Sequence, residues 1–263
     1  MAGRLNGKVA IVAGAGSSGA GLGNGKATAI LFAREGAKVL CVDRVLGRAE
    51  ETCAIIAGEG GVASALAADV GQRADCEAMV ATAVERYGRL DVLHNNVGIV
   101  SLQTIQQVTE EEWDRLMAVN VKSVLLAIQA AIPAMEAVGG GSIVNVASVA
   151  GMRYAGAALT SYSASKAGII GLTLSAAGQL GEKRIRVNCI APGLVYTPMV
   201  AAVLAPEARE RRRLGGLIQD EGTGWDVGWA AVYLASDESR WVTGQVLVVD
   251  AGLSITTRDQ GIG

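Results

Sequence analysis

The sequence predicts an α/β fold: a doubly wound, seven-stranded parallel sheet with helices on both faces. Two observations predict it. Short apolar runs rich in β-branched residues alternate with longer amphipathic segments, which is the pattern of consecutive βαβ units. Glycines also stand where such helices would end, at positions 36, 58, 88, 139 and 181. No repeat or linker interrupts the alternation, so we expect one dinucleotide-binding and catalytic domain over residues 1–263.

The strands are expected at the short apolar runs, because a parallel strand is buried on both faces. In chain order they are residues 9–13, 38–42, 62–66, 92–94, 142–147, 186–190 and 246–249. The helices are expected in the amphipathic stretches between them, at 26–34, 48–57, 73–87, 110–137, 161–180 and 225–234. The segment 196–224 is irregular and follows the sixth strand, which predicts a substrate lid; packing of this segment onto the core is the alternative.

Composition excludes several classes of protein. The 263 residues carry 23 Lys and Arg against 25 Asp and Glu, a net charge of −2, which argues against a nucleic-acid partner. The uncharged stretch 187–206 contains Pro192, Gly193 and Pro198, which break a spanning helix, so we expect no membrane association. His94 is the single histidine and the cysteines form no Cys-x-x-Cys pair, which predicts no metal and a reduced, cytoplasmic protein; the cysteines are Cys41, Cys53, Cys76 and Cys189.

A glycine-rich segment, GAGSSGAGLGNG, occupies residues 14–25 after the first strand. Glycines let backbone amides approach a pyrophosphate, and the N-terminus of the following helix favours its negative charge. Gly14, Gly16 and Gly19 match the Rossmann pattern G-x-G-x-x-G, but a helix from there would carry three more glycines, each costing about 1 kcal/mol relative to Ala. We therefore expect a long loop, with the helix beginning at Lys26. The expected cofactor contacts in it are Gly14, Ser17, Asn24 and Gly25.

Asp43 stands at the end of the second strand, 18 residues after Gly25. This is close to the separation of about 20 residues at which an acid accepts hydrogen bonds from the ribose hydroxyls. A carboxylate there repels a 2′-phosphate, which favours NAD over NADP. Two alternatives stay open: Arg44 binds the phosphate of NADP, or Asp43 only caps the following helix.

Tyr162 and Lys166 lie four residues apart in the pattern Tyr-Ser-Ala-Ser-Lys, so on a helix they share one face. An ammonium beside a phenol favours the phenolate, and a nearby nicotinamide cation adds to this effect. The pair therefore predicts a tyrosine general acid/base. The alternative is an ordinary pair on an exposed helix face.

Two polar residues extend this group. Ser148 follows the fifth strand, where its hydroxyl is placed to bond a substrate oxygen; a serine in a turn is the alternative. Asn120 lies within the expected helix 110–137, where an amide is a mediocre helix former. A buried asparagine there needs hydrogen-bond partners, and a satisfied core amide is the alternative to a catalytic role.

From Leu5 to about Leu253 the chain resembles the short-chain dehydrogenase/reductase family in its common single-domain form. The family's motifs occur in order, and the ordered set is specific. They are Gly14 with Gly23-Asn24-Gly25, Asp69-Val70, Asn95-Asn96-Val97-Gly98, Asn120, Ser148, Tyr162 with Lys166, Pro192-Gly193-Leu194-Val195-Tyr196-Thr197-Pro198-Met199, and Val249-Asp250-Ala251-Gly252.

The resemblance implies a role for each catalytic residue. Tyr162 is the acid/base, and Lys166 lowers its pKa while holding the ribose hydroxyls. Ser148 orients the substrate oxygen, and Asn120 supports a water through which Lys166 exchanges protons with solvent. The implied cofactor contacts are Asp69 and Val70 beside the adenine, Asn96 and Gly98 beneath the dinucleotide, and Val195 and Thr197 at the nicotinamide carboxamide.

The chain departs from the family's pattern at three places. The glycine loop is longer than usual and begins after Ala13 in place of Thr; Ser148 and Tyr162 are 14 residues apart, one more than is common. Val97 replaces the usual alanine, and His94 replaces an aliphatic residue. We expect His94 to be a strand-end residue with a satisfied ring, and a catalytic role is the alternative.

The predicted reaction is the NAD-dependent interconversion of a secondary alcohol and its ketone. Met152, Tyr154 and Met199, together with Ser148 and Tyr162, are the expected substrate contacts and suggest an apolar substrate, cyclic or aromatic. The lid arginines between 209 and 213 alternate with glutamates, so we expect a solvated helix face there rather than a site for an acidic substrate.

Two other functions stay open. One is an NADPH-dependent 3-oxoacyl-acyl-carrier-protein reductase, and the other is a non-catalytic dinucleotide-binding sensor. The resemblance also implies a homotetramer, with a dimer as the alternative, formed through the two long helices and the region of Trp225, Trp229 and Trp241. Packing of these tryptophans within one subunit is the competing account.

Overall fold

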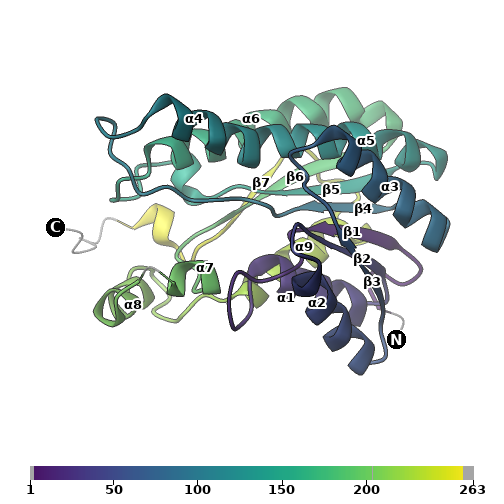
Figure 1. The fold of residues 1–263 in the computed structure, drawn as a ribbon, viewed down its shortest axis with the longest axis horizontal. Coiled ribbons are helices and arrows are strands. Elements are labelled where there is room, and N and C mark those ends of the chain that lie inside the picture. The colour runs from purple at the N-terminus through teal and green to yellow at the C-terminus, as the bar shows by residue number, and fades with distance from the viewer. Residues whose placement is uncertain (1–2, 203, 257–263) are drawn as a thin grey trace.

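The structure is a computed structural model, and it describes residues 3–202 and 204–256. Its centre is one parallel sheet of seven strands in the order β3-β2-β1-β4-β5-β6-β7 (Figure 1). This confirms the predicted doubly wound architecture. The strand boundaries differ from the expected ones by at most two residues: β1 Val9–Ala13, β2 Lys38–Asp43, β3 Val62–Ala67, β4 Val92–Asn95, β5 Gly141–Val146, β6 Ile185–Pro192 and β7 Val246–Val249.

The strands are apolar throughout because the sheet is covered on both faces. In β1, Val9 and Ile11 belong to one buried cluster, and Ala10 and Val12 belong to the other. Figure 1 shows one layer of helices above the sheet and one below it. The upper layer holds α3 Arg73–Tyr87, α4 Glu110–Met117, α5 Ser123–Ala137 and α6 Thr160–Leu180; the lower layer holds α1 Asn24–Arg34, α2 Leu46–Gly58 and α9 Gly224–Ala235.

Helix α1 begins two residues earlier than expected, at Asn24, with Gly23 as its extended N-cap. The expectation weighed only the helix propensity of glycine. Here Gly25 is needed inside the helix, because a Cβ at this position would lie 1.9 Å from the carbonyl oxygen of Gly14. The close approach of the first turn to the end of β1 therefore outweighs the propensity cost.

The expected helix 110–137 is continuous but changes geometry in the middle. A π-helical turn at Ala118–Lys122 joins α4 to α5, and it contains Asn120. Among the described residues, this helix is also long and apolar enough to cross a membrane, with 44% of the most apolar window buried in the fold. Its buried side chains, including Leu126 and Met135, pack on the sheet as those of a core helix do.

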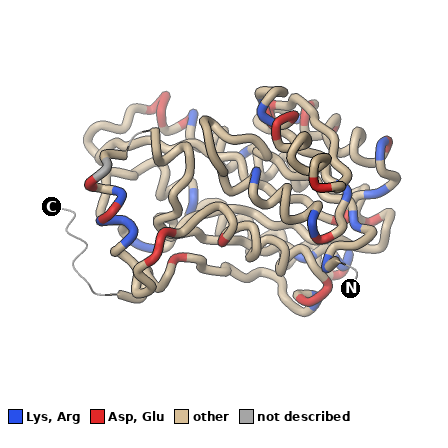
Figure 2. Tube along the Cα trace, turned by 90° about the horizontal axis from the view of Figure 1, so that it is seen from below, with Lys and Arg blue, Asp and Glu red and all other residues tan. Residues whose placement is uncertain are grey.

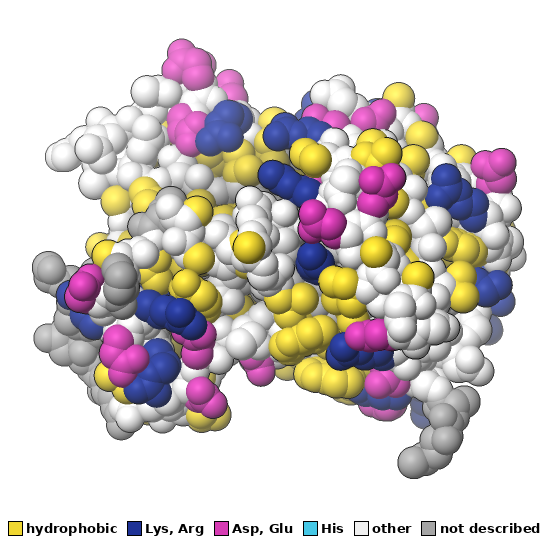
Figure 3. Space-filling view, turned by 60° about the horizontal axis from the view of Figure 1, so that its bottom comes forward, with side chains coloured by type: hydrophobic (Ala, Val, Ile, Leu, Met, Phe, Trp, Pro, Cys, Tyr) yellow, Lys and Arg dark blue, Asp and Glu magenta, His cyan; other side chains and the backbone are white. Residues whose placement is uncertain are grey.

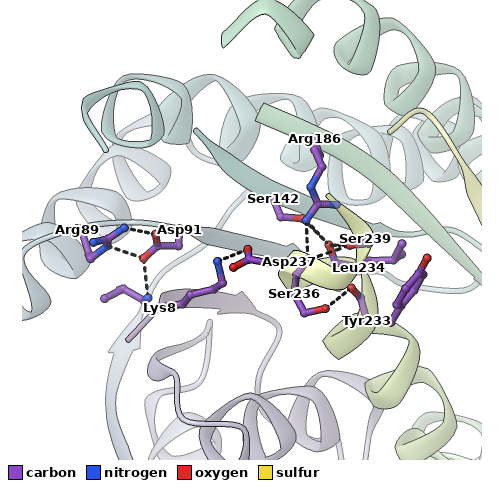
Figure 4. A network of polar contacts seen from close by, with 11 residues as sticks. Lys8, Arg89, Asp91, Ser142, Arg186, Tyr233, Leu234, Ser236, Asp237 and Ser239 are labelled. Atoms are coloured by element: carbon purple, nitrogen blue, oxygen red, sulfur yellow. Dashed lines mark hydrogen bonds and ion pairs between the residues drawn. The ribbon is translucent and has the colours of Figure 1, made fainter. Parts of the chain in front are cut away.

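A polar network ties the amino ends of the central strands together (Figure 4). Asp91 accepts a hydrogen bond from the backbone amide of Val9 at 2.8 Å and pairs with Arg89. Ser142, at the start of β5, donates to the carbonyl of Leu234 at the end of α9. Arg186 of β6 donates to the same carbonyl at 2.9 Å. These hydrogen bonds fix the amino edge of the sheet, and the predicted site residues lie at the opposite, carboxyl edge.

Two short helices interrupt the segment 196–224, α7 Pro198–Ala201 and α8 Pro206–Arg213. They form a separate lobe beside the carboxyl edge of the sheet (Figure 1). The backbone amide of Tyr196 donates to the carbonyl of Gly222 at 2.8 Å, so the two ends of this segment lie side by side. Charges of both signs are interspersed along the chain trace, the lobe included (Figure 2).

Candidate active site

The predicted site residues come together at the carboxyl edge of the sheet. Gly14 follows β1, Asp43 ends β2, Asn96 follows β4 and Ser148 follows β5. Strands β1 and β4 are neighbours, and the chain runs outward from them in opposite directions. In doubly wound folds, ligands bind at this switch point.

The glycine loop and Asp43 are in direct contact. Asp43 accepts hydrogen bonds from the amide of Gly16 at 3.2 Å and from the amide of Val45 at 2.9 Å. The second bond closes a turn before α2, whose N-cap residue is Val45 and which has no side-chain capping hydrogen bond, so Asp43 does not cap the following helix. A Cβ at Gly16 would lie 2.6 Å from Asp43 Oδ2 and 2.5 Å from Arg48 Cβ. Arg48, which sequence analysis did not select, therefore also borders the loop.

The rest of the loop is shaped by polar side chains. Ser17 is buried, and its hydroxyl accepts the amide of Gly23 at 2.9 Å, which folds the loop back on itself. Asn96 donates to the carbonyl of Gly14 at 3.1 Å, and Gly14 has a positive φ of 79°. Asn24 Oδ1 is buried and has no hydrogen-bond partner among the described residues. A buried polar atom at a glycine-rich helix N-terminus fits a loop that binds a dinucleotide.

Two further predicted cofactor residues lie next to Asp43. Asp69 and Val70 follow β3, whose last residue, Ala67, pairs with Asp43. Asp69 accepts the amide of Gly71 at 2.9 Å and donates its own amide to Asp75 at 2.7 Å. The acidic residues Asp43 and Asp69 therefore lie near each other at the carboxyl ends of β2 and β3.

Helix α6 brings Tyr162 and Lys166 to the end of β5. Lys166 is buried, its Nζ donates to the carbonyl of Val146 at 2.9 Å, and Nζ lies 5.6 Å from the centre of the Tyr162 ring. Ser148 is near enough to Tyr162 to act on the pKa of its hydroxyl, and the Ser148 hydroxyl accepts the amide of Ala150 at 3.2 Å. The three predicted side chains therefore face one another.

The chain alone shifts the pKa values of Tyr162 and Lys166 in opposite directions. Burial raises the pKa of Tyr162 above 10, and the hydrogen bond from Ser148 works in the opposite direction. Burial lowers the pKa of Lys166 to about 8. The protein by itself holds the phenol protonated, so the predicted lowering of the Tyr162 pKa depends on further positive charge nearby.

Asn120 is completely buried, and its amide is satisfied within the chain. Its Oδ1 accepts the amide of Ile99 at 2.8 Å, and its Nδ2 donates to the Ile99 carbonyl and to Ser165, each at 2.9 Å. These bonds hold the segment after β4 against α6. A Cβ at Gly98 would lie 3.2 Å from Lys166 Nζ, so glycine here avoids crowding the buried ammonium. The π-helical turn around Asn120 is a feature often found at functional sites.

His94 corrects one expectation. It is fully buried in β4, but neither ring nitrogen has a hydrogen-bond partner among the described residues, so the predicted satisfied ring is wrong. The ring instead packs edge-to-face on Phe32 with centroids 6.1 Å apart, and burial lowers its pKa to about 3. His94 therefore serves as a neutral aromatic core residue.

The residues expected to contact the substrate are not grouped as closely as the catalytic residues. Met152, Tyr154 and Met199 are 48%, 80% and 43% exposed. Tyr154 borders a cavity of about 400 Å³ together with Ala164 and Ala167, and neither Ser148 nor Tyr162 lines it. The structure thus does not place Tyr154 in one cavity with Ser148 or Tyr162.

The arginines between 209 and 213 behave largely as expected. Arg209 pairs with Glu221 and Arg213 pairs with Glu210, both at the surface. Figure 3 shows positive and negative side chains mixed over this lobe. Arg212 differs: it is half-buried, and its guanidinium approaches the Val195 carbonyl at 3.5 Å. Val195 is itself buried, and Thr197 is the N-cap residue of α7.

Comparison with known proteins agrees with this geometry. A family model described as enoyl-(acyl carrier protein) reductase matches residues 19–254. The 3-oxoacyl-[acyl-carrier-protein] reductase of Thermotoga maritima is 41% identical over 256 residues, covering 96% of this chain and 100% of the relative. The structure of a short-chain dehydrogenase/reductase from Burkholderia xenovorans superposes with a TM-score of 0.93 at 42% identity, covering 98% of this chain and 100% of that one. The chain belongs to the short-chain dehydrogenase/reductase family.

Membership confirms the resemblance that the motifs predicted and makes the chain an oxidoreductase of the class acting on CH–OH donors. Another member is 7α-hydroxysteroid dehydrogenase, whose structure holds NADH and 7-oxoglycochenodeoxycholic acid. It superposes with a TM-score of 0.89 at 35% identity and covers 95% of each chain. Family members bind a nicotinamide dinucleotide.

Proposed function

We propose that this protein is an NAD-dependent dehydrogenase that interconverts a secondary alcohol and its ketone. The observation that carries the proposal is the meeting of Ser148, Tyr162 and Lys166 beside the glycine loop at the switch point of the sheet. A sensor that only binds a dinucleotide has no need of this group. The test is Tyr162→Phe, which should abolish turnover and leave dinucleotide binding intact.

Each residue has a task in the proposed mechanism. The loop amides and the N-terminus of α1 bind the pyrophosphate, and Asp43 accepts hydrogen bonds from the adenosine ribose. A bound nicotinamide supplies the hydride chemistry. Ser148 holds the substrate oxygen beside the Tyr162 hydroxyl, so that Tyr162 takes or gives the proton at that oxygen. Lys166, held by the Val146 carbonyl, adds positive charge that stabilises the phenolate.

Asp43 supports the preference for NAD, because its carboxylate borders the loop through the Gly16 amide. The 7α-hydroxysteroid dehydrogenase structure was determined with NADH. One observation favours the NADPH-dependent 3-oxoacyl reductase as the second candidate: the Cβ of Arg48 borders the same loop position, so its side chain is a candidate to bind a 2′-phosphate. Separate fluorescence titrations with NADH and NADPH distinguish the two.

For the substrate we propose an apolar cyclic alcohol or ketone. The half-exposed side chains of Met152 and Met199 support it, and a solved relative carries a steroid derivative. We also propose that residues 196–224 act as the lid over this substrate. A panel of cyclic, aromatic and linear secondary alcohols, assayed with the preferred dinucleotide, tests the class.

We further propose a cytoplasmic homotetramer. Leu125 of α5 and Leu174 of α6 are 39% and 53% exposed, and Trp229 and Trp241 are 47% and 92% exposed. Such apolar side chains on two separate surfaces suit two kinds of subunit contact. Light scattering coupled to size-exclusion chromatography tests the assembly, and a dimer is the alternative outcome.

A further inference from the structure

A cavity of about 260 Å³ lies at the amino edge of the sheet, at the end opposite to the candidate active site. The starts of β1, β4, β5 and β6 border it, together with the end of α9. None of the predicted site residues is among the residues that border it. One water molecule needs about 10–15 Å³ of such space, so the cavity has room for a small polyatomic ion.

The lining of this cavity is strongly charged, with four cationic side chains and two carboxylates. They are Lys8, Arg89, Arg184, Arg186, Asp91 and Asp237. Both carboxylates already have a cation: Asp91 pairs with Arg89 at 2.6 Å and Asp237 pairs with Lys8 at 2.8 Å (Figure 4). Asp91 also accepts the backbone amide of Val9. The positive charge of the two remaining arginines is therefore in excess.

Arg186 is held in place by backbone carbonyls and not by a carboxylate. Its guanidinium donates to the carbonyls of Leu234 at 2.9 Å, Ser236 at 3.2 Å and Val242 at 3.3 Å. These bonds use at most three of its five N–H groups, so at least two donors remain. Burial lowers the pKa of Arg186, and the charge of Asp237 acts in the opposite direction without forming an ion pair. Because arginine keeps its proton, Arg186 is a half-buried cation that no carboxylate of the described residues pairs with.

Arg184 brings a second cation to the same cavity. Its backbone is fixed: the carbonyl accepts the amide of Gly141 at 3.2 Å, and the amide donates to the carbonyl of Gly181 at 2.9 Å. Its φ of 56° is uncommon for a residue other than glycine. The side chain is exposed and forms no hydrogen bond or ion pair with any residue that the structure describes. The guanidinium of Arg184 is therefore available to a ligand.

We propose that this cavity binds a tetrahedral oxyanion, a phosphate or sulfate group, between Arg184 and Arg186. Arginine N–H groups form charge-assisted hydrogen bonds with such oxygens, and an anion offsets the excess positive charge of the lining. Lys8 adds a third cation, because its partner Asp237 is 85% exposed and a surface pair of this kind is weak. The site lies across the sheet from Tyr162, so it does not rest on the proposed reaction.

The experiment follows the modification of individual arginines in the full-length protein. Phenylglyoxal reacts with free guanidinium groups, inorganic phosphate is the probe, and peptide mass spectrometry gives the rate at each arginine while sodium chloride keeps the ionic strength constant. We expect phosphate to slow the modification of Arg184 at least about threefold, with a half-maximal effect at about 1 mM. Arg73 of α3 is exposed and forms no ion pair with the described residues, so its rate should stay unchanged.

Two variants change the site in opposite directions. Arg186→Gln removes one unpaired cation, so the concentration for half-maximal protection of Arg184 should rise about tenfold. Asp237→Asn removes a carboxylate and releases Lys8, so this concentration should fall about threefold. The second variant alters an exposed side chain and decides the question even if Arg186→Gln does not fold. Arg73→Gln is the matched control and should leave the protection unchanged.

Several outcomes overturn the proposal. Phosphate protects no arginine, or it protects Arg73 as strongly as Arg184, or it protects only Arg44 and Arg48 beside the glycine loop. Protection of Arg184 that neither Arg186→Gln nor Asp237→Asn alters also overturns it. Parallel arms with sulfate and with glycerol phosphate identify the source of the anion: equal protection by phosphate and sulfate indicates a free ion, and stronger protection by the ester indicates a phosphorylated small molecule. An NADH titration tests the proposed function separately.

Discussion

Lys166 Nζ lies 5.6 Å from the centre of the Tyr162 ring and donates to the Val146 carbonyl at 2.9 Å. One helical turn separates the two residues, and the carbonyl at the end of β5 fixes the direction of the ammonium. This contact links the sheet to α6 and fixes the position of the ammonium relative to the Tyr162 phenol.

Tyr162→Phe removes the proton-transferring oxygen and little volume. We expect kcat to fall by about 10² to 10⁴, the usual contribution of a positioned general acid/base, and the dissociation constant for NADH to stay within about twofold. Steady-state kinetics and a fluorescence titration measure the two quantities. Tyr154→Phe is the control, since Tyr154 borders a cavity that neither Ser148 nor Tyr162 lines, and equal losses in both variants would contradict the assignment.

The buried ammonium of Lys166 gives stability a dependence on pH. Its pKa falls from 10.5 to about 8 in the folded protein, so between these values the unfolded chain binds more protons and the free energy of unfolding should rise with pH. Lys166→Met removes this contribution, which amounts to at most about 3 kcal/mol between pH 8 and 10.5. Urea unfolding of both proteins across this range measures it. A variant with the same pH slope as the parent would refute the burial argument.

Asn120→Ala leaves the amide and carbonyl of Ile99 without their buried partner. We expect the free energy of unfolding to fall by about 2 to 4 kcal/mol, because buried backbone groups are costly when unpaired. Urea denaturation gives the value. Gln129→Ala, which alters an exposed amide of α5, is the control and should change stability by less than about 0.5 kcal/mol.

Asp43→Asn removes the negative charge beside the loop. NADH should bind about tenfold more weakly, because hydrogen bonds to a charged group are lost, and NADPH should bind more tightly as repulsion disappears. Paired titrations measure both changes. Glu50→Gln makes the same change of charge on an exposed position of α2 and should leave the preference unchanged. If NADPH remains the weaker ligand by the same factor, Asp43 does not select the cofactor.

Gly25→Ala places a methyl group 1.9 Å from the Gly14 carbonyl oxygen. The first turn of α1 must then move away from β1, which should destabilise the fold by about 1 to 3 kcal/mol and weaken dinucleotide binding. Gly47→Ala is the matched control, because a Cβ there meets nothing within 4 Å. Thermal unfolding and an NADH titration compare the two, and similar behaviour would contradict the close approach.

The sheet was predictable because each strand is buried on both faces, which leaves a continuous apolar run in the sequence. The grouping of Ser148, Tyr162 and Lys166 was predictable from one helical spacing and one strand end. The start of α1 was not, since the contact of Gly25 with Gly14 is made across the fold. The same holds for the unpartnered ring of His94, which no local pattern encodes.

The hydrogen bond between Tyr196 and Gly222 has a consequence for engineering. It holds the two ends of the intervening segment next to each other. The hydrogen bonds of Asp91 and Arg186 hold the opposite edge of the sheet. Residues 197–221 therefore constitute an exchangeable cassette. A graft of the corresponding segment from another family member, joined at these two points, is expected to transfer substrate preference while the catalytic group and the barrier to unfolding of the host remain unchanged.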